Sequence, residues 1–405
     1  MEKIYDIAIV GGGIVGAAVA YKIQRAHPTL KIAVFEKEKT LAAHQTGHNS
    51  GVIHSGLYYK PGSYKAKNCV AGRTELVQFA QDNKVAHDVC GKVVVAKNES
   101  ELPFLEKIFA NGIANNTEGI EKIDADKIRE IEPSCVGVKG IWVPSTGIID
   151  FVGVTNTCAE LMKGINPKSS VYLGTEIQNF EKGSINTLYT NKGEFKSKKI
   201  IFCGGLQSDR LAKKDNVNPG MKIVGFRGDY YELTDQAKHK VRNLIYPVPN
   251  PAFPFLGVHF TRMVNGDVEC GPNAVFTFKR EGYGKTDFNW KDTREALAYK
   301  GTWKLFKNNW RFGLDEYRRA FSKKLFLERL RDLIPSLEME DLKPGRSGVR
   351  AMALGPEGEM IEDFKIEYKD NAIHVLNAPS PAATSCLAIG DQVREMADKY
   401  FDLVD

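Results

Sequence analysis

The chain has 405 residues, of which 42% are hydrophobic, and it carries a formal net charge of +6. This length and composition suit a globular protein of two or three domains, and the charge is too small for the concentrated basic surface of a nucleic-acid binder. The seven cysteines are scattered and include no C-x-x-C pair, which argues against a disulfide framework or a zinc ribbon and favours a reducing compartment.

The N-terminal residues, MEKIYD, lack the basic and apolar regions of a signal peptide. The longest apolar run is short and rich in glycine, so it does not suit a bilayer span. We therefore expect a cytoplasmic protein without a membrane-spanning segment.

Residues 5–38 have the order strand, glycine turn, helix, strand and acid. Gly11, Gly13 and Gly16 follow the G-x-G-x-x-G spacing, in which glycine permits the tight turn, the approach of a pyrophosphate and close packing of the helix on the strand. Glu36 ends the second strand, where a carboxylate binds a ribose 2′-hydroxyl and disfavours a 2′-phosphate. A glycine pattern alone also occurs in structural turns, but the complete unit predicts a dinucleotide site, with Lys37 as a neighbouring candidate contact.

Residues 42–66 form a polar stretch, rich in small residues and histidine, that we expect to be a functional loop. His44 and His48 are four residues apart, a spacing that on a helix can ligate a metal. The glycines and the lack of nearby acids in the sequence favour hydrogen-bonded loop histidines instead, so we predict no metal site.

The following residues alternate between the two kinds of regular structure. Helical patterns cover 66–83, 99–115, 122–133, 151–164, 299–331 and 383–401, and Asp150 is placed to cap the fourth of these. Strand patterns cover 89–98, 140–143, 171–182, 184–195, 222–290, 364–370 and 372–381. Residues 198–212 form a second strand, glycine turn and helix unit, and residues 343–354 begin a closing unit.

Units of the nucleotide-binding type therefore lie at the start, in the middle and at the end of the chain, with strand-rich sequence between them. This order predicts an α/β fold in which a discontinuous Rossmann-like domain (1–90, 140–220 and 340–405) is interrupted by an antiparallel-sheet substrate domain (91–139 and 221–339).

Four motifs resemble one family of flavoprotein oxidoreductases, which includes glycine oxidase, sarcosine oxidase and glycerol-3-phosphate dehydrogenase. They are HNSGVIHSGLYY (48–59), LGVHFTRMVNGDVECGPNA (256–274), GRSGVRA (345–351) and NAPSPAATSCLAIG (377–390), and they are most similar to its L-2-hydroxyglutarate oxidase/dehydrogenase branch. The resemblance implies bound FAD and oxidation of a 2-hydroxy acid, with L-2-hydroxyglutarate as the leading substrate and quinone or oxygen as electron acceptor. An amine or amino-acid oxidase of the same fold and a non-catalytic flavin-binding redox sensor remain the alternatives.

The further candidate cofactor contacts are Ser50 and Gly51 in the first motif, Gly204 in the second glycine turn, which could close over the adenosine half or simply pack the sheet, and Thr384 and Ser385 near the flavin ring at the start of the last helix. A helix N-terminus there would stabilise the negative charge that a reduced flavin carries on its N1–C2=O edge. An ordinary capped terminal helix is the structural alternative.

Substrate oxidation needs a base for the hydroxyl proton and a cation for each carboxylate. The candidate bases are His54 and His259. We expect Arg350 beside the reacting carbon and Arg262 at the distal carboxylate, with Arg227 as a weaker candidate. Each of these could instead be a structural residue, and Tyr58 and Tyr59 could wall the flavin or belong to the core.

Residues 299–331 contain ten Lys or Arg against three Asp or Glu, with aromatic and leucine residues spaced by threes and fours. We expect an amphipathic helix pair that packs on the substrate domain, with a break near Gly313. The alternative is an interfacial helix that docks on anionic lipid and lets the reduced flavin meet a quinone. The sequence leaves the number of subunits open.

Overall fold

The structure is a computed structural model that describes residues 3–249 and 257–403. Residues 250–256, which belong to the expected strand-rich range 222–290, lie outside the described residues. The N-terminal unit folds as the sequence predicts, with β1 (Ile4–Val10), α1 (Ile14–Ala26) and β2 (Ile32–Phe35). β1 and β2 pair in parallel, so the carboxyl ends of both strands meet at the glycine turn.

The first sheet has eight strands and is built around this unit. Its order is β10 (Ile177–Glu181), β11 (Asn186–Thr190), β12 (Gly193–Phe202), β1, β2 and β9 (Ser170–Tyr172). Beside β12 lies β20 (Ala372–Asn377), which also pairs with β19 (Lys365–Lys369). β12 pairs in parallel with β1 and antiparallel with β11, so the predicted meander and the second glycine unit share one strand.

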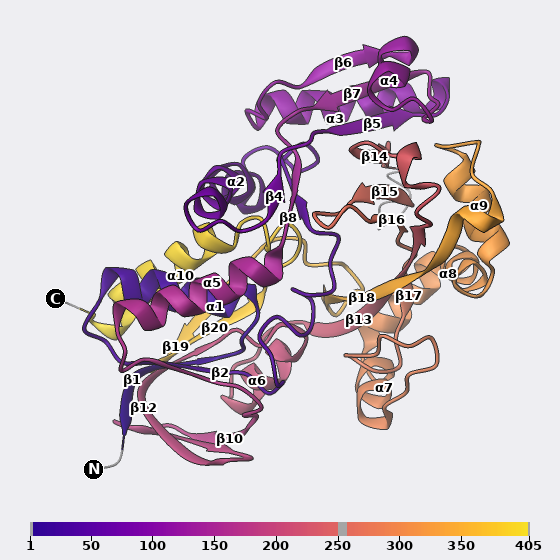
Figure 1. Ribbon diagram of the computed structural model, residues 1–405. Helices are drawn as coiled ribbons and strands as arrows, with labels where there is room; N and C mark the ends of the chain where they lie inside the picture. Colours follow the sequence, from indigo (N-terminus) through magenta and orange to yellow (C-terminus); the bar gives the residue numbers. More distant parts are fainter. Residues whose placement is uncertain (1–2, 250–256, 404–405) are drawn as a thin grey trace.

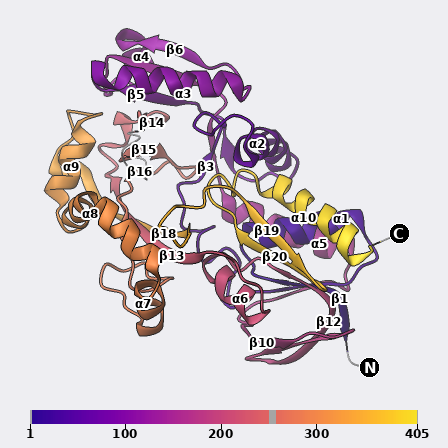
Figure 2. The same ribbon diagram turned by 180° about the vertical axis from the view of Figure 1, so that it is seen from behind.

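Three helices cover one side of this sheet, namely α1, α5 (Phe151–Ile165) and α10 (Cys386–Phe401) (Figure 1). α1 contacts both of the others, as the view from behind shows for α10 (Figure 2). Ala17 and Ala18 of α1 are fully buried. Their small side chains let the neighbouring helices approach α1 closely. Asp150 occupies the N-cap position of α5, but its side chain makes no capping hydrogen bond, so the predicted cap is wrong.

The second sheet has nine strands. Its order is β17 (Val275–Phe276), β13 (Lys222–Leu233), β16 (Val268–Gly271), β15 (His259–Arg262), β14 (Leu244–Pro247), β5 (Lys92–Ala96), β7 (Lys139–Val143) and β6 (Glu121–Asp124). The long strand β18 (Leu342–Leu354) pairs antiparallel with β13 along its whole length. Helices α3 (Leu102–Ala114) and α4 (Ala125–Ile131) contact β7.

A small third sheet, of β3 (Val52–Ile53), β8 (Gly147–Ile149) and β4 (His87–Asp88), lies between the two large sheets (Figure 1). Near it lies α2 (Tyr64–Asp82), which contacts α10, while α6 (Ser208–Lys214) contacts β20. The predicted domain ranges stay a prediction. Two strands inside the ranges assigned to the Rossmann-like part, most of β7 and all of β18, pair within the second sheet.

Residues 290–331 form α7 (Trp290–Leu297), α8 (Lys300–Phe321) and α9 (Lys323–Arg331), on the outer side of the second sheet (Figure 1). The break predicted near Gly313 lies four residues earlier, at Asn309. At Asn309 the backbone leaves the helical conformation and kinks α8. A second separation, which we did not predict, falls at Ser322, whose hydroxyl accepts a hydrogen bond from Leu325 N and so caps α9. Within 3–249 and 257–403, none of the helices has the length and apolar character that a bilayer crossing requires.

Candidate cofactor and substrate cavity

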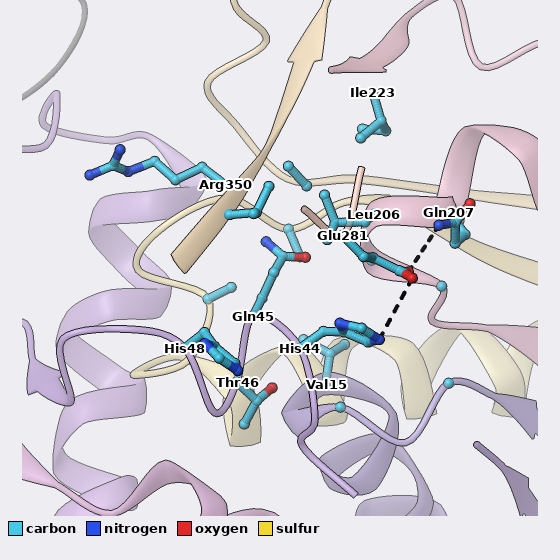
Figure 3. A pocket seen from close by; sticks show the side chains of 18 of the residues that line it. Val15, His44, Gln45, Thr46, His48, Leu206, Gln207, Ile223, Glu281 and Arg350 are labelled. Carbon is cyan, nitrogen blue, oxygen red and sulfur yellow. Dashed lines mark hydrogen bonds and ion pairs between the residues drawn. The ribbon is translucent and has the colours of Figure 1, made fainter. Parts of the chain in front are cut away.

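One cavity of about 1340 Å³ runs from the glycine turn of the first sheet to the inner face of the second. Its wall includes the turn after β1, the end of β2, the loop before β3, the turn after β12 and the segment before α10. From the second sheet and its surroundings come Tyr230, Tyr246, His259, Glu281 and Arg350. In Figure 3, the Arg350 side chain extends away from His44 and Glu281, which lie at another part of the wall.

The glycine turn leaves no room for side chains. Gly11 has a φ of +117°, and a Cβ placed on it would lie 2.3 Å from the carbonyl oxygen of Cys203. A Cβ on Gly16 would lie 2.0 Å from the Gly11 oxygen. Gly13 is the N-cap of α1 and has no capping side chain. The turn therefore presents backbone and the helix N-terminus to the cavity, as an anion-binding turn requires.

Glu36 lies in the cavity wall at the end of β2, as predicted. Its two carboxylate oxygens accept hydrogen bonds from Gly12 N (2.8 Å) and Glu38 N (2.9 Å). Each oxygen keeps a second lone pair for a ligand. Glu36 therefore both orients the glycine turn and presents acceptors to the cavity.

Lys37 lies beside His44, Glu38 and Glu281, a group with the residue types of a metal site. The ammonium is 2.7 Å from Glu281 Oε2, 2.8 Å from Glu38 Oε1 and 3.1 Å from His44 Nε2. Burial alone would lower the pKa of Lys37, but the hydrogen bonds that its ammonium donates to Glu281 and Glu38 outweigh burial and raise that pKa. The lysine thus supplies the cation that the two carboxylates need, in the place where a metal would sit. His48 instead bonds the Ser347 carbonyl at 2.8 Å.

Thr384 also lies in the cavity wall and is fully buried. Its hydroxyl accepts from His54 N (3.1 Å) and donates to Val52 O (3.3 Å), which fixes the segment that carries His54. Ser385 is the N-cap of α10 and lies behind this wall, and its buried Oγ has no hydrogen-bond partner among the described residues.

Among the other candidate cofactor contacts, Ser50 and Gly204 line the cavity. Among the described residues, the cavity wall does not include Gly51. Its φ of +66° lies in the left-handed region that favours glycine, so the turn before β3 accounts for a glycine at this position.

His54, His259 and Arg350 all line the cavity, so the structure brings these three predicted residues together. Burial lowers the pKa of His259 to about 3, helped by the charges of Arg350 and Lys92 and opposed by its bond to Gly257. Burial, Lys92 and His259 likewise lower the pKa of His54 to about 3. Both rings are therefore neutral near pH 7 and can accept a proton.

The hydrogen bond from His259 Nδ1 to Gly257 O, 2.9 Å long, assigns the tautomer of this ring. A carbonyl oxygen can only accept, so Nδ1 carries the proton and Nε2 keeps the lone pair. The ring also stacks on Tyr246, with centroids 4.0 Å apart. His259 is thus held with a proton acceptor at Nε2.

The structure does not bring the other predicted substrate residues to the cavity. Arg262 lies outside the wall formed by the described residues and pairs with Asp88. Arg227 is buried against Asp229, at 2.7 Å, and the Gly284 carbonyl, which are structural contacts. Tyr58 and Tyr59 also lie outside the described wall.

Sequence reasoning missed two kinds of residue at this end of the cavity. Tyr230 and Tyr246 line the wall, and Lys92 lies behind it, under the ring of Tyr246. Lys92 stands at the start of the valine-rich strand KVVVA, and a lysine at a buried strand position is the signal that could have identified it.

This chain is similar to known proteins over nearly its whole length. Residues 6–396 match the family model described as FAD dependent oxidoreductase. The L-2-hydroxyglutarate dehydrogenase of Indibacter alkaliphilus is 46% identical over 98% of this chain and 100% of that protein. The protein of the same name from Escherichia coli K12 is 41% identical over 96% of this chain and 92% of its own length.

Solved structures show the same fold. The L-alpha-glycerophosphate oxidase of Mycoplasma pneumoniae, with FAD bound, superposes with a TM-score of 0.78 at 23% identity over 98% of this chain and 94% of that one. The glycine oxidase of Geobacillus kaustophilus gives 0.74 at 15% identity over 99% and 96%. With a family model that spans nearly the whole chain and relatives above 40% identity, this chain belongs to the FAD-dependent oxidoreductase family, in the group that contains the L-2-hydroxyglutarate dehydrogenases.

Proposed function

We propose that this chain oxidises L-2-hydroxyglutarate to 2-oxoglutarate with FAD as its cofactor. The observation that carries the proposal is the meeting of two neutral imidazoles and a guanidinium, from His54, His259 and Arg350, in one cavity with the glycine turn. The proposed substrate is taken from the names of the relatives. The cavity contains the base and the cation that oxidation of a hydroxy acid needs.

The residues present fit FAD. The space that a Cβ on Gly11 or Gly16 would fill is the approach that a pyrophosphate needs, and the Glu36 carboxylate suits a ribose. Thr384 and the N-terminus of α10 suit the flavin ring. When bound, FAD supplies the acceptor for the two electrons that leave the hydroxy acid.

The protein groups then have separate tasks. Nε2 of His259, or the imidazole of His54, takes the proton of the substrate hydroxyl. Arg350 binds the carboxylate beside the reacting carbon, where a guanidinium can make two parallel hydrogen bonds. The buried surroundings strengthen both interactions, since little water competes with them.

Anaerobic mixing of the yellow holoenzyme with single substrates tests the proposal. We expect L-2-hydroxyglutarate to bleach the flavin, and lactate, glycine and sarcosine to leave it oxidised or to act far more slowly. Rapid bleaching by glycine or sarcosine would identify an amine oxidase instead. A flavin that stays oxidised with every compound would identify a non-catalytic flavoprotein.

The same assay separates the two histidines. In His54→Asn and His259→Asn, the variant that has lost the base should be reduced about 10² to 10⁴ times more slowly at saturating substrate. If both variants are reduced at the wild-type rate, neither imidazole is the base.

For electron delivery we propose a cytoplasmic protein that makes peripheral contact with a membrane and reduces a quinone. The supporting observation is a set of large apolar side chains on α7 and α8 that are more than half exposed, namely Trp290, Trp303, Trp310, Leu314 and Phe321. Lysine and arginine side chains share these helices. Tryptophan beside basic residues suits an anionic lipid surface.

Cosedimentation with vesicles tests this contact. Wild-type protein should sediment with vesicles that contain phosphatidylserine at low salt, and 0.5 M NaCl should release it, since salt screens the lysines. Trp303→Ala combined with Trp310→Ala should weaken sedimentation without loss of bound FAD, whereas Tyr189→Ala, an exchange on β11, should leave it unchanged. Equal recovery of wild type and double variant with the vesicles would contradict the proposal.

A further inference from the structure

Lys92 is a buried lysine in a place without an opposite charge. Its relative exposure is 1%, and its ammonium lies 4.6 Å from the ring centroid of Tyr58 and 5.0 Å from that of Tyr246. Across residues 3–249 and 257–403, its ammonium has contacts with these two rings but no ion pair or hydrogen-bond acceptor. Burying an unpaired charge costs free energy on folding. A buried lysine without an anionic partner is therefore expected to have a function that offsets this cost.

The strand register places Lys92 on the cavity side of the second sheet. Lys92 is in register with Leu244 on β14, and Leu244 is in register with Thr261 on β15. Tyr246 and His259 stand two positions along from these residues and stack on each other. Since side chains two apart share a face, Lys92 lies on the face that carries Tyr246 and His259, both of which line the cavity. Lys92 itself stands directly behind this described wall, against the ring of Tyr246.

The surrounding titratable groups do not neutralise this ammonium. Burial raises the pKa of the Cys69 thiol to about 12 and the pKa values of Tyr58 and Tyr246 above their ordinary range, so all three are neutral near pH 7. His54 and His259 are neutral bases. Burial also lowers the pKa of Lys92 itself to about 7, as expected for an ammonium whose anion is missing.

The proposed substrate brings two carboxylates into a cavity in which Arg350 can hold one. We infer that the ammonium of Lys92 binds the distal carboxylate of the dicarboxylate substrate, and that Lys92 thereby selects a five-carbon diacid over a short monoacid. Arg262, which we expected in this role, already has a carboxylate partner in Asp88. The inference rests on the proposed function, since it concerns the same substrate.

Calorimetric titration of the holoenzyme with two unreactive acids tests the inference. Glutarate carries both carboxylates and butyrate carries one. Lys92→Met should weaken glutarate binding at least about 30-fold, because the distal carboxylate loses its buried partner, while butyrate binding should change less than about threefold. Arg262→Met, which also removes one cation, is the matched control and should bind glutarate like wild type.

Thermal unfolding without ligand separates a ligand-binding lysine from a structural one. Lys92→Met, or Lys92→Gln should the first variant fold poorly, should unfold at the wild-type temperature or above it, because each removes an unpaired buried charge. Glutarate affinity within threefold of wild type would overturn the inference. Lower unfolding temperatures in both variants, with equal losses for glutarate and butyrate, would overturn it too and make the lysine structural.

The proposed function can fail separately. If L-2-hydroxyglutarate bleaches the wild-type flavin while Lys92→Met keeps its glutarate affinity, only the assignment of Lys92 falls. If wild type is not reduced by L-2-hydroxyglutarate and binds glutarate no better than butyrate, the proposed function falls and this inference with it.

Discussion

At the scale of single residues, Lys92 links stability to pH. Its pKa in the folded chain is about 7, against 10.5 for an ordinary lysine. Between these values the unfolded chain holds the proton and the folded chain does not, so the free energy of unfolding should rise with pH from about 7 to 10.5, by up to about 4 to 5 kcal/mol. Urea unfolding of the holoenzyme from pH 6.5 to 10 should show this rise in wild type but not in Lys92→Met. Parallel curves for the two proteins would contradict it.

The carboxylate of Glu36 is expected to contribute to FAD binding. Its hydrogen bonds to Gly12 N and Glu38 N hold the turn in which FAD is proposed to bind. Glu36→Ala should weaken FAD binding to the apoprotein about 10- to 100-fold, since a hydrogen bond to a charged group contributes about 1.5 to 3 kcal/mol. Fluorescence titration of the apoprotein with FAD measures this. Glu367→Ala, on β19, is the control and should bind FAD normally.

At the scale of elements, two helical glycines have opposite roles. A Cβ on Gly16 in α1 would lie 2.0 Å from the Gly11 oxygen, whereas one on Gly313 in α8 would meet no neighbouring atom within 4 Å among the described residues. Gly313→Ala should therefore stabilise the protein by about 0.5 to 1 kcal/mol, the difference in helix propensity. Gly16→Ala should instead lower the unfolding temperature and the amount of bound FAD. A stabilising Gly16→Ala would show that the close packing at this turn is not needed.

Local elements could be predicted from the sequence, and pairings between distant segments could not. The β1–α1–β2 unit follows from neighbouring residues, because the turn needs glycine and the helix needs small residues. The antiparallel pairing of β13 with β18 joins residues more than a hundred positions apart, and no local pattern specifies it. The same limit explains which site residues could be identified from the sequence and which could not. His54 and Arg350 lie in recognisable motifs, whereas the positions of Lys92 behind Tyr246 and of Arg262 beside Asp88 depend on strand register.

At the scale of the whole molecule, the cavity is the place where the two large sheets meet. Val10 and Phe35 line it from the first sheet, and Tyr246 and Arg350 line it from the second. A ligand that fills this cavity would therefore contact both sheets at once. Cofactor binding and the stability of the whole chain should then be coupled.

Mass action sets the size of the coupling between FAD binding and stability. A ligand that binds only the folded chain adds RT ln(1 + [FAD]/Kd) to the free energy of unfolding, about 2.7 kcal/mol at a hundredfold excess over Kd, or roughly 3 °C in unfolding temperature for a chain of this length. Thermal scans of the apoprotein at increasing FAD should show a temperature that rises with the logarithm of FAD concentration. In Glu36→Ala the same rise should begin at a correspondingly higher concentration. An unfolding temperature independent of FAD would mean that FAD does not bind the folded chain in preference to the unfolded one.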